Sequence, residues 1–360
     1  MKVLALASYP MEAACTRYRV EQFVQPLAQH GITVTVRPFI DSDLFARLYQ
    51  QRSWLRTALG LTKSGLLRLR DVVAAANADV VLVQREAMLI GPPIIEWLTT
   101  RVLRRTMVLD LDDATYVPYT SPTYGRVAKA VKFFGKTDDL IRWSRIVVCG
   151  NQTIAEYVSS KGARVEIIPT VVDLKRFRPN RSRDASMPVL GWVGSHSTFP
   201  FLESILPALT ELAKSYSFKL KIVGSGQASV SIPGVEVENL EWSLQREIED
   251  FRSVDIGLYP LNADNNWTMG KSGFKAIQWM AVGIPYVATP IGAAAQIGEP
   301  DVTHYFANTP AEWIAKLQLL LSDAEKRRAM GEAGRKYALE NFDLNAQADK
   351  LASVLREAAG

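Results

Sequence analysis

The sequence predicts an α/β protein built from two Rossmann-like domains. Short apolar runs of strand length alternate with helix-length amphipathic segments, which is the pattern of parallel sheets covered by helices. The chain has 360 residues, enough for two cores of ordinary size. A polar connection at residues 179–182 separates two such series. We expect an N-terminal domain over residues 1–172, a second domain over 173–340, and a C-terminal helix over 341–360 that is free to cross back to the first domain.

The first series alternates strands and helices over about half the chain. Its predicted strands are Lys2–Ser8, Ile32–Phe39, Asp79–Gln84, Thr106–Leu111, Ile146–Cys149 and Val165–Ile168. Its predicted helices are Tyr18–His30, which ends at Gly31, and Asn151–Ser160. Continuous apolar runs in several of these strands indicate a parallel sheet that is buried on both faces.

The second series repeats this organisation. Its predicted strands are Val189–Val193, Lys219–Val223, Asp255–Tyr259 and Tyr286–Ala288. Its predicted helices are Phe201–Ser215, Phe274–Val282, Ala311–Leu321, Ala324–Asn341 and Leu344–Ala359. Two domains of this kind face each other across a cleft, and ligands bind at the carboxyl ends of the strands. The architecture alone allows many functions, so particular residues must decide.

The composition indicates a soluble globular protein, with 48% hydrophobic and 22% charged residues. No apolar run approaches the roughly 20 residues of a membrane span, and we interpret the N-terminal apolar run as a buried strand rather than a signal peptide. Cys15 and Cys149 are too far apart to indicate a disulfide framework, and His30, His196 and His304 are too scattered to indicate a metal site. We therefore expect a cytoplasmic protein with no bound metal and no cofactor.

Positive charge is concentrated in the first half of the chain. Residues 1–180 contain 25 Lys and Arg against 16 Asp and Glu, whereas residues 181–360 contain 17 against 21. This half should meet an anionic partner: a phosphorylated acceptor, a membrane surface or nucleic acid. We expect no nucleic acid, because the basic excess is spread over a domain that has no recognisable nucleic-acid-binding motif.

The segment Arg47–Arg70 contains six basic residues and no acidic one, with Leu and Trp between them. A basic amphipathic stretch is typical of proteins that contact an anionic membrane surface, here the inner face of the cytoplasmic membrane. The other interpretation is a solvated helix that packs on its own domain. Both remain open.

The segment Trp267–Gly292 contains a glycine-rich loop, with Gly270, Lys271 and Gly273, that runs directly into a helix. Backbone N–H groups at a helix N-terminus bind phosphate well, and Lys271 adds a positive charge. The alternative is a loop in which the glycines only turn the chain and the lysines are solvated.

This segment resembles the signature of family-4 glycosyltransferases, which have the two-domain GT-B fold. Their helix reads Glu-Ala-Met-Ala-x-Gly-x-Pro, and Gln278–Pro285 here reads Gln-Trp-Met-Ala-Val-Gly-Ile-Pro. Further pieces of the pattern follow in the family's order: Ile168–Asp173, Gly191–Ser195, Lys221–Gly226, Asp255–Pro260 and a closing helix with Phe342. The resemblance therefore extends over most of the chain.

The resemblance implies a retaining, metal-independent transfer of a hexosyl group from an NDP-sugar. The acceptor would be a polyprenyl-linked or other glycan in surface polysaccharide or glycolipid synthesis. The second domain would hold the donor through a set of matched positions: Gly194, Ser195, Gly273 and Phe274 at the phosphates, Lys271 and Ser272 in the same loop, Gln278 at the ribose and Trp242 near the base.

Two departures from the family pattern bear on activity. The family has two glutamates separated by seven residues, and Gly270 and Gln278 occupy those positions here. The basic residues that usually clamp the diphosphate after Gly194 are also absent, and we expect Lys271 to replace them. The missing glutamate leaves a second hypothesis, a non-catalytic donor-binding or scaffold protein. A third, an epimerase on the same fold, needs histidines that this chain largely lacks.

Carboxylates follow a strand of the first domain in Asp110-Leu111-Asp112-Asp113. We predict that Asp112 or Asp113 orients the acceptor hydroxyl or holds the sugar. The alternative for one of them is a helix N-cap. Charged residues also follow two other strands at the same edge, and we predict that they bind the acceptor: Arg17, Arg19, Arg85 and Glu86. Their alternatives are a solvated helix start for the first pair and a surface ion pair for the second.

Overall fold

The computed structural model describes residues 1–48, 54–118, 131–180, 187–227, 229–262 and 266–360. The chain forms two compact units. Unit 1 comprises Met1–Thr170, Gly270–Ser272 and Leu344–Gly360, and unit 2 comprises Val171–Met269 and Gly273–Asp343. The segment Gly270–Ser272 therefore groups with unit 1, although it lies in the stretch where the sequence predicts the donor domain.

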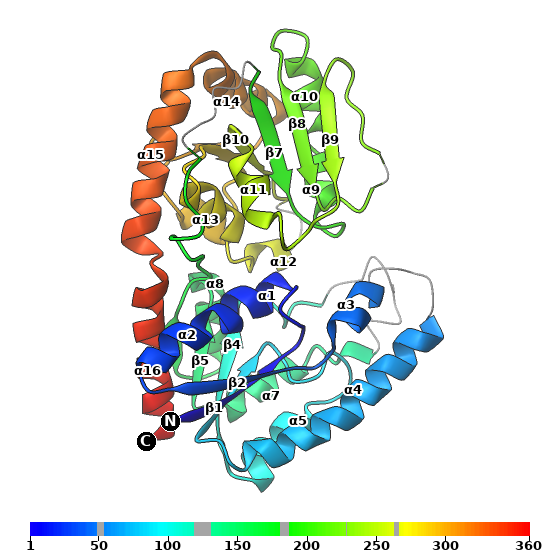
Figure 1. Cartoon of the computed structure of the whole chain (residues 1–360), viewed down its shortest axis with the longest axis vertical. Coiled ribbons are helices and arrows are strands. Elements are labelled where there is room, and N and C mark those ends of the chain that lie inside the picture. Colours follow the sequence, from blue (N-terminus) through cyan, green and yellow to red (C-terminus); the bar gives the residue numbers. More distant parts are fainter. Residues whose placement is uncertain (49–53, 119–130, 181–186, 228, 263–265) are drawn as a thin grey trace. The chain divides into compact units, whose positions relative to one another are not determined.

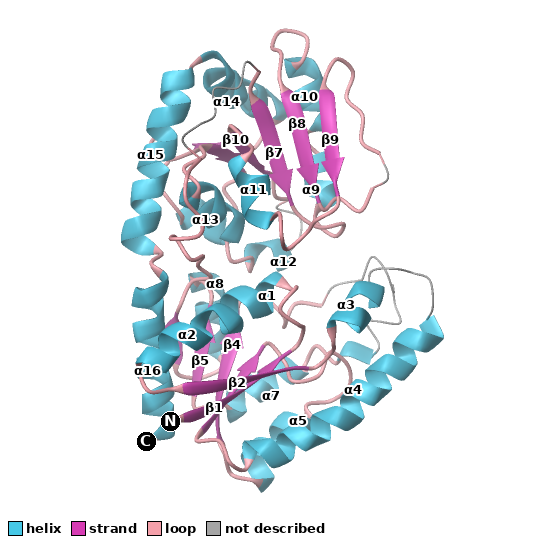
Figure 2. Cartoon of the chain, in the orientation of Figure 1, coloured by secondary structure: helices cyan, strands magenta, loops and turns pink. Residues whose placement is uncertain are grey.

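Unit 1 contains a parallel six-stranded sheet in the order β2-β1-β3-β4-β5-β6 (Figures 1 and 2). The strands are β1 Lys2–Ala7, β2 Thr33–Pro38, β3 Val80–Gln84, β4 Thr106–Leu111, β5 Ile146–Cys149 and β6 Val165–Ile167. The helices are α1 Ala14–Thr16, the π-helix η1 Arg17–Glu21, α2 Gln22–Gln29, α3 Ser42–Leu48, α4 Trp54–Ala75, α5 Ile94–Trp97, the π-helix η2 Leu98–Val102, α7 Lys136–Trp143, α8 Gln152–Ser160 and α16 Leu344–Ala359.

The connections in unit 1 reverse direction between β1 and β3. The chain runs from β1 outward to β2, then returns to the other side of β1 to form β3, where Ala7 lies opposite Gln84. Open parallel sheets bind ligands beyond the carboxyl ends of the strands at such a reversal. A ligand site of unit 1 is therefore expected beside the residues that follow β1, β3 and β4.

The last helix, α16, belongs to unit 1. It packs against α2 and β4, with Leu351 and Leu355 buried. Arg356 donates a 2.7 Å hydrogen bond to the carbonyl of His30, and Arg164 forms an ion pair with Glu357. This packing covers the apolar face of α16, a helix that no strand follows in the sequence.

Unit 2 also contains a parallel six-stranded sheet, in the order β12-β11-β10-β7-β8-β9. The strands are β7 Val189–Val193, β8 Lys219–Val223, β9 Glu236–Leu240, β10 Ile256–Tyr259, β11 Tyr286–Ala288 and β12 Tyr305–Phe306. The helices are α9 Phe199–Glu203, α10 Leu206–Leu212, α11 Glu247–Arg252, α12 Asn266–Met269, α13 Phe274–Ala281, the 3₁₀-helix η3 Gly292–Gln296, α14 Pro310–Ser322 and α15 Ala324–Asn341. Here the order reverses between β7 and β10, as in a Rossmann fold.

The predicted α/β class with two Rossmann-like sheets is confirmed. Several elements of the second series differ from the prediction, among them the short elements β12, α11, α12 and η3, which the sequence did not indicate. The single helix predicted over Phe201–Ser215 is two helices, because Pro207 stands in the first turn of α10 and begins a new helix there. The sequence did not indicate β9, because Glu236–Leu240 is a half-exposed edge strand with polar residues rather than an apolar run.

Tight packing of glycines against aromatic and branched side chains shapes the core of unit 2. A Cβ on Gly257 would lie 2.6 Å from the ring of Trp279, and one on Gly191 would lie 2.2 Å from Val254. Trp279 is fully buried and meets Phe251 edge-on at 4.5 Å between ring centroids. This packing fixes α13 against β10 and so sets where the N-terminus of α13 begins. Among the described residues no helix is long and apolar enough to cross a membrane.

Candidate functional site

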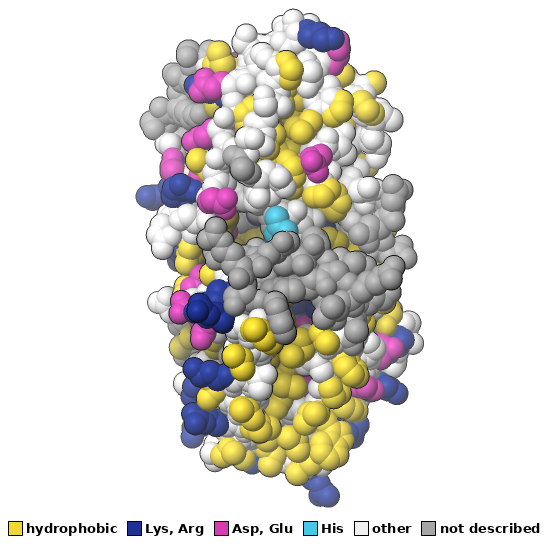
Figure 3. Space-filling view, turned by 90° about the vertical axis from the view of Figure 1, so that its right-hand side faces the viewer, with side chains coloured by type: hydrophobic (Ala, Val, Ile, Leu, Met, Phe, Trp, Pro, Cys, Tyr) yellow, Lys and Arg dark blue, Asp and Glu magenta, His cyan; other side chains and the backbone are white. Residues whose placement is uncertain are grey.

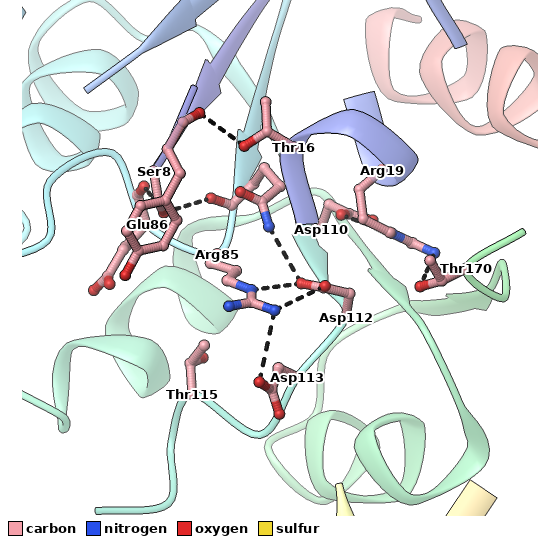
Figure 4. Close-up of polar contacts among 12 residues, drawn as sticks. Ser8, Thr16, Arg19, Arg85, Glu86, Asp110, Asp112, Asp113, Thr115 and Thr170 are labelled. Carbon is pink, nitrogen blue, oxygen red and sulfur yellow. Dashed lines mark hydrogen bonds and ion pairs between the residues drawn. The ribbon is translucent and has the colours of Figure 1, made fainter. Parts of the chain in front are cut away.

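A cluster of charged side chains lies beyond the carboxyl ends of β3 and β4 in unit 1 (Figure 4). Arg85 directly follows β3, and Asp112 and Asp113 directly follow β4. Arg85 has φ +63°, a left-handed conformation that is uncommon for a residue with a side chain. The reversal of the chain at Arg85 turns its guanidinium toward the two aspartates, as Figure 4 shows.

Arg85 and Asp112 form a bidentate ion pair. Arg85 Nε lies 2.6 Å from Asp112 Oδ1 and Arg85 Nη2 lies 2.8 Å from Oδ2, while Gln84 Nε2 donates a third bond of 3.2 Å to Oδ1. Burial alone would raise the pKa of Asp112, but the charge and hydrogen bonds of Arg85 outweigh it and hold this pKa below its usual value. Asp112 is thus an ionised carboxylate whose two oxygens are already engaged. A direct contact of Asp112 with an acceptor or sugar stays a prediction, and these bonds leave little of its carboxylate for such a contact.

Asp113 is engaged more weakly. Its Oδ2 lies 3.6 Å from Arg85 Nη2, its side chain is 19% exposed, and its Oδ1 accepts a hydrogen bond from the backbone N–H of Ala114. Residues 112–118 contain bends and turns but no helix, so neither aspartate is a helix N-cap. Of the two predicted catalytic residues, Asp113 is therefore the one with oxygen surface left for a ligand.

The predicted acceptor residues Arg17 and Arg19 are turned into unit 1. Arg19 is 3% exposed, forms a bidentate ion pair with Asp110 and donates a 2.6 Å bond to the carbonyl of Ile168. Arg17 is 8% exposed and donates 2.9 Å bonds to the carbonyls of Met11 and Glu12. Both guanidiniums therefore hold loops of unit 1 in place. Neither is the solvated helix start that the sequence also allowed.

Glu86 is also buried. Its carboxylate lies 2.8 Å from Lys136 Nζ and 3.3 Å from Lys132 Nζ. Ser8 Oγ, just after β1, lies 3.1 Å from the carbonyl of Gln84 and 3.0 Å from that of Glu86. The Ser8 contacts join the strand ends across the reversal between β1 and β3. The two lysines pair with Glu86 inside unit 1, so Glu86 is neither part of a surface ion pair nor an exposed acceptor contact.

Lys271 belongs to this same cluster. Burial lowers its pKa, Asp113 partly offsets that effect, and Arg85 adds to it, so Lys271 lies within electrostatic reach of both side chains. Ser272 follows it in the same segment of unit 1 and is half-buried. The structure thus brings a predicted donor-binding lysine together with a predicted catalytic aspartate.

Asn151 anchors this segment, a role that was not predicted from the sequence. Its Nδ2 donates to the carbonyls of Gly270 at 3.0 Å and Lys271 at 3.2 Å, while its Oδ1 caps α8 by accepting from the N–H of Ile154 at 2.9 Å. Its position directly after Gly150, where β5 ends at the same sheet edge, was a usable signal. A Cβ on Gly270 would lie 2.3 Å from that of Ala114, so a glutamate does not fit there without rearrangement.

In unit 2, the loops that follow β7 and β8 meet beside the reversal of that sheet. Ser195 N–H donates a 3.0 Å bond to Thr198 Oγ1, which closes a tight turn after β7. A Cβ on Gly194 would lie 2.2 Å from the Trp192 ring, and one on Gly224 would lie 2.5 Å from the carbonyl oxygen of Gly194. Trp242, half-buried after β9, lies against Gly224. Gly194, Ser195 and Trp242 thus share one edge of unit 2.

The N-terminus of α13 is shaped by Gly273. This residue has φ +66°, and a Cβ on it would lie 2.3 Å from Ile297 Cδ1, so both its backbone and its surroundings favour glycine. Phe274 is the first residue of the helix. The first-turn N–H groups of a helix point out of its N-terminus, where an anion can accept from them.

Gln278 is turned into unit 2. It has no exposed surface, its Oε1 accepts a 2.8 Å bond from Lys275 Nζ, and its Nε2 has no hydrogen-bond partner in the part of the chain that the structure describes. Gln278 therefore has no exposed atom with which to make the predicted contact to a ribose hydroxyl. Lys275 also lies 5.0 Å from the ring centroid of Phe251. In the described ranges, no group of three or more His, Cys, Asp or Glu is placed to hold a metal ion.

Comparison with known proteins matches unit 2 to a family. The model of the family described as "Glycosyl transferases group 1" matches residues 187–323. A D-inositol 3-phosphate glycosyltransferase of Segniliparus rotundus is 25% identical over 57% of this chain and 49% of its own length. The chain spans about half the length of the curated relatives it matches.

Solved structures match nearly the whole chain. A sucrose-phosphate synthase of Thermosynechococcus elongatus has a TM-score of 0.70 at 14% identity and covers 99% of each chain. Anabaena Alr3699/HepE in complex with UDP-glucose has a TM-score of 0.70 at 15% identity and covers 99% of this chain and 100% of its own. At these identities the match establishes the fold, which is the predicted one.

Proposed function

We propose that this chain, a family-4-like glycosyltransferase with the GT-B fold, transfers a sugar from a nucleotide sugar to an acceptor hydroxyl. The observation that carries the proposal is the edge of unit 2 beside its β7–β10 reversal, where the Gly194–Thr198 turn lies inside the segment matched by the group 1 family. Ligands bind at this position in Rossmann sheets. The likeness to a protein crystallised with UDP-glucose supports a nucleotide sugar as the ligand.

The proposed reaction is a retaining transfer. The acceptor oxygen bonds to the anomeric carbon while the bond from that carbon to the diphosphate oxygen breaks. The nucleoside diphosphate leaves with the bonding electrons, and the acceptor proton passes to its departing oxygen. We propose Lys271 as a source of positive charge for the diphosphate, and we propose that no metal is needed.

For the acceptor or sugar hydroxyls, we propose Asp113 as the interacting carboxylate. Asp112 acts through Arg85, as a positioning residue, because both of its oxygens already accept hydrogen bonds from that guanidinium. The buried guanidinium–carboxylate pair fixes the strand ends from which Asp113 projects. We do not assign Arg17, Arg19 or Glu86 to the acceptor, because their charges are already paired or hydrogen-bonded inside unit 1.

The proposed acceptor is an anionic one, a glycan precursor or glycolipid of surface polysaccharide synthesis, met in the cytoplasm at the inner face of the membrane. The basic excess of residues 1–180 supports an anionic acceptor. The similarity to D-inositol 3-phosphate glycosyltransferases makes a phosphorylated polyol the second acceptor to test.

A donor screen tests the proposal. UDP-, GDP-, TDP- and ADP-sugars are added separately, and the melting temperature is recorded. A ligand that binds only the native state should raise it by about 5 °C at roughly a hundredfold excess over Kd. Hydrolysis of the stabilising donor without acceptor then separates an enzyme from a donor-binding scaffold, which hydrolyses none. If none of the four donors shifts the melting temperature, the proposal fails.

A further inference from the structure

The helix α4 is held on unit 1 by one buried arginine. Arg68 is 1% exposed and donates 2.8 Å hydrogen bonds to the carbonyls of Ala7, Arg37 and Ala87, and its charge is paired with Asp71 at 2.9 Å. Three of these partners, the carbonyls, lie outside α4 and fix the rotation of the helix about its axis. The opposite face of α4 must therefore point away from unit 1.

That outward face is apolar. Leu59, Leu66 and Val73 are spaced by seven residues and are 70%, 64% and 71% exposed. Seven residues complete nearly two helical turns, so these side chains form one stripe along the helix. Leu55 and Leu69, at 57% and 48% exposure, widen it. We call these five residues the leucine stripe.

A row of positive charge runs along one side of the leucine stripe. Arg56, Lys63 and Arg70 are exposed and follow the same seven-residue spacing. The only acidic residue of α4 is Asp71, which is 15% exposed and is turned inward to Arg68. The outward face of α4 is therefore both apolar and purely cationic, a combination that a merely solvated helix does not need.

An apolar cavity of about 430 Å³ opens beside α4 on the inward flank of the stripe. Its walls include Phe39, Leu61, Gly65, Met88 and Phe133. Phe133 is itself 51% exposed. In the view that faces this side of the molecule, hydrophobic side chains gather over unit 1 and Lys and Arg side chains border them (Figure 3).

We propose that the outward face of α4 docks unit 1 on an anionic lipid bilayer. The leucine stripe enters the boundary between headgroups and acyl chains, and Arg56, Lys63 and Arg70 contact anionic headgroups. The neighbouring cavity receives an acyl or prenyl chain of a membrane lipid. Charge complementarity favours this occupant over a second copy of the chain, because two such faces would bring their cationic rows together. The inference deepens the membrane location proposed above and holds whether or not the sugar chemistry does.

Vesicle flotation tests the docking without any sugar donor. The full chain is mixed with vesicles of neutral phosphatidylcholine or of phosphatidylcholine with about 30% phosphatidylglycerol, whose negative surface potential attracts basic segments. Wild type should float with the anionic vesicles and stay at the bottom with the neutral ones. Leu59→Ser with Leu66→Ser should lower the bound fraction about tenfold, and Lys63→Glu with Arg70→Glu should lower it by more, at about fivefold per lost positive charge.

Matched variants in unit 2 keep the test specific. Leu319→Ser with Leu339→Ser removes two leucines of 42% and 50% exposure, and Arg328→Glu with Lys336→Glu reverses two exposed charges. Both should float like wild type. The proposal is overturned if wild type does not float, if it binds neutral vesicles equally well, or if the α4 variants float as well as the unit 2 variants. Self-association that the leucine-stripe variant abolishes, with no flotation of wild type, would assign the face to a second copy instead. Because flotation needs no donor, its failure is distinct from failure of the proposed transfer.

Discussion

Arg85 holds Asp112 through two parallel hydrogen bonds of 2.6 and 2.8 Å. The left-handed backbone of Arg85, at φ +63°, folds its guanidinium back over the end of the neighbouring strand. The pair neutralises two charges at the edge where a substrate would bind, and it leaves Asp113 as the carboxylate that is only loosely engaged.

Asp112→Asn should lower the free energy of unfolding by up to about 3 kcal/mol, because it leaves the part-buried charge of Arg85 with only the looser 3.6 Å contact to Asp113. Urea denaturation measures this loss. The double variant Arg85→Met with Asp112→Leu should be less destabilised than Asp112→Asn alone, since no unpaired charge remains. If the double variant loses as much stability as Arg85→Met and Asp112→Leu lose together, the two residues are not coupled.

Gly273→Ala should destabilise unit 2 by about 2–4 kcal/mol, from the left-handed backbone and from the 2.3 Å approach to Ile297. Gly234→Ala is the matched control, because Gly234 has φ +77° but nothing within 4 Å of an added Cβ. The control should cost only the backbone part, about 1–2 kcal/mol. Equal losses in thermal unfolding would show that the contact with Ile297 is unimportant.

His304 should make the fold sensitive to acid. Burial lowers the pKa of His304 to about 4, so its neutral form is kept in the folded protein. An unfolded histidine protonates near pH 6.5, so this contribution to stability is intact above that pH and is lost progressively as the pH falls toward 4. The loss should be about 3 kcal/mol.

Denaturation curves at pH 7 and pH 4.5 check this for wild type, His304→Gln and His30→Gln. The His304→Gln variant should lose less stability between the two pH values than wild type. His30→Gln is the control, because His30 is partly exposed and lies 2.9 Å from Asp349. This variant should lose about as much stability between the two pH values as wild type. An unchanged pH dependence in His304→Gln would refute the assignment.

Lys271→Ala should raise the KM for the nucleotide sugar or lower kcat by about 10- to 100-fold, the size expected for losing a hydrogen bond from a charged donor. Steady-state kinetics with the donor found by the thermal screen measure it. Lys336→Ala on α15, an exposed lysine of unit 2, is the control and should leave both constants unchanged. Kinetics within twofold of wild type would remove Lys271 from the proposed diphosphate site.

The sequence by itself determined the two parallel sheets. Runs such as Val80–Val83 and Val189–Val193 are apolar throughout, which suits strands covered on both faces, and glycines such as Gly31 mark where helices end. It also determined which strand ends bear charged residues, since that depends only on residue order. The edge strand β9 was not predicted, because its polar sequence lacks this apolar pattern.

Only the tertiary structure decided what those charged residues do. Arg19 and Glu86 stand at positions where the sequence predicts ligand contacts, but each is buried against a partner from elsewhere in the chain. The same holds for Asn151 and Gly270, which are 119 residues apart and hydrogen-bonded. Gln278 is also fully buried, although its partner Lys275 belongs to the same helix. The physical reason is that a short polar pattern specifies the chemistry of a side chain, whereas its partner and its exposure depend on long-range packing that no local pattern encodes.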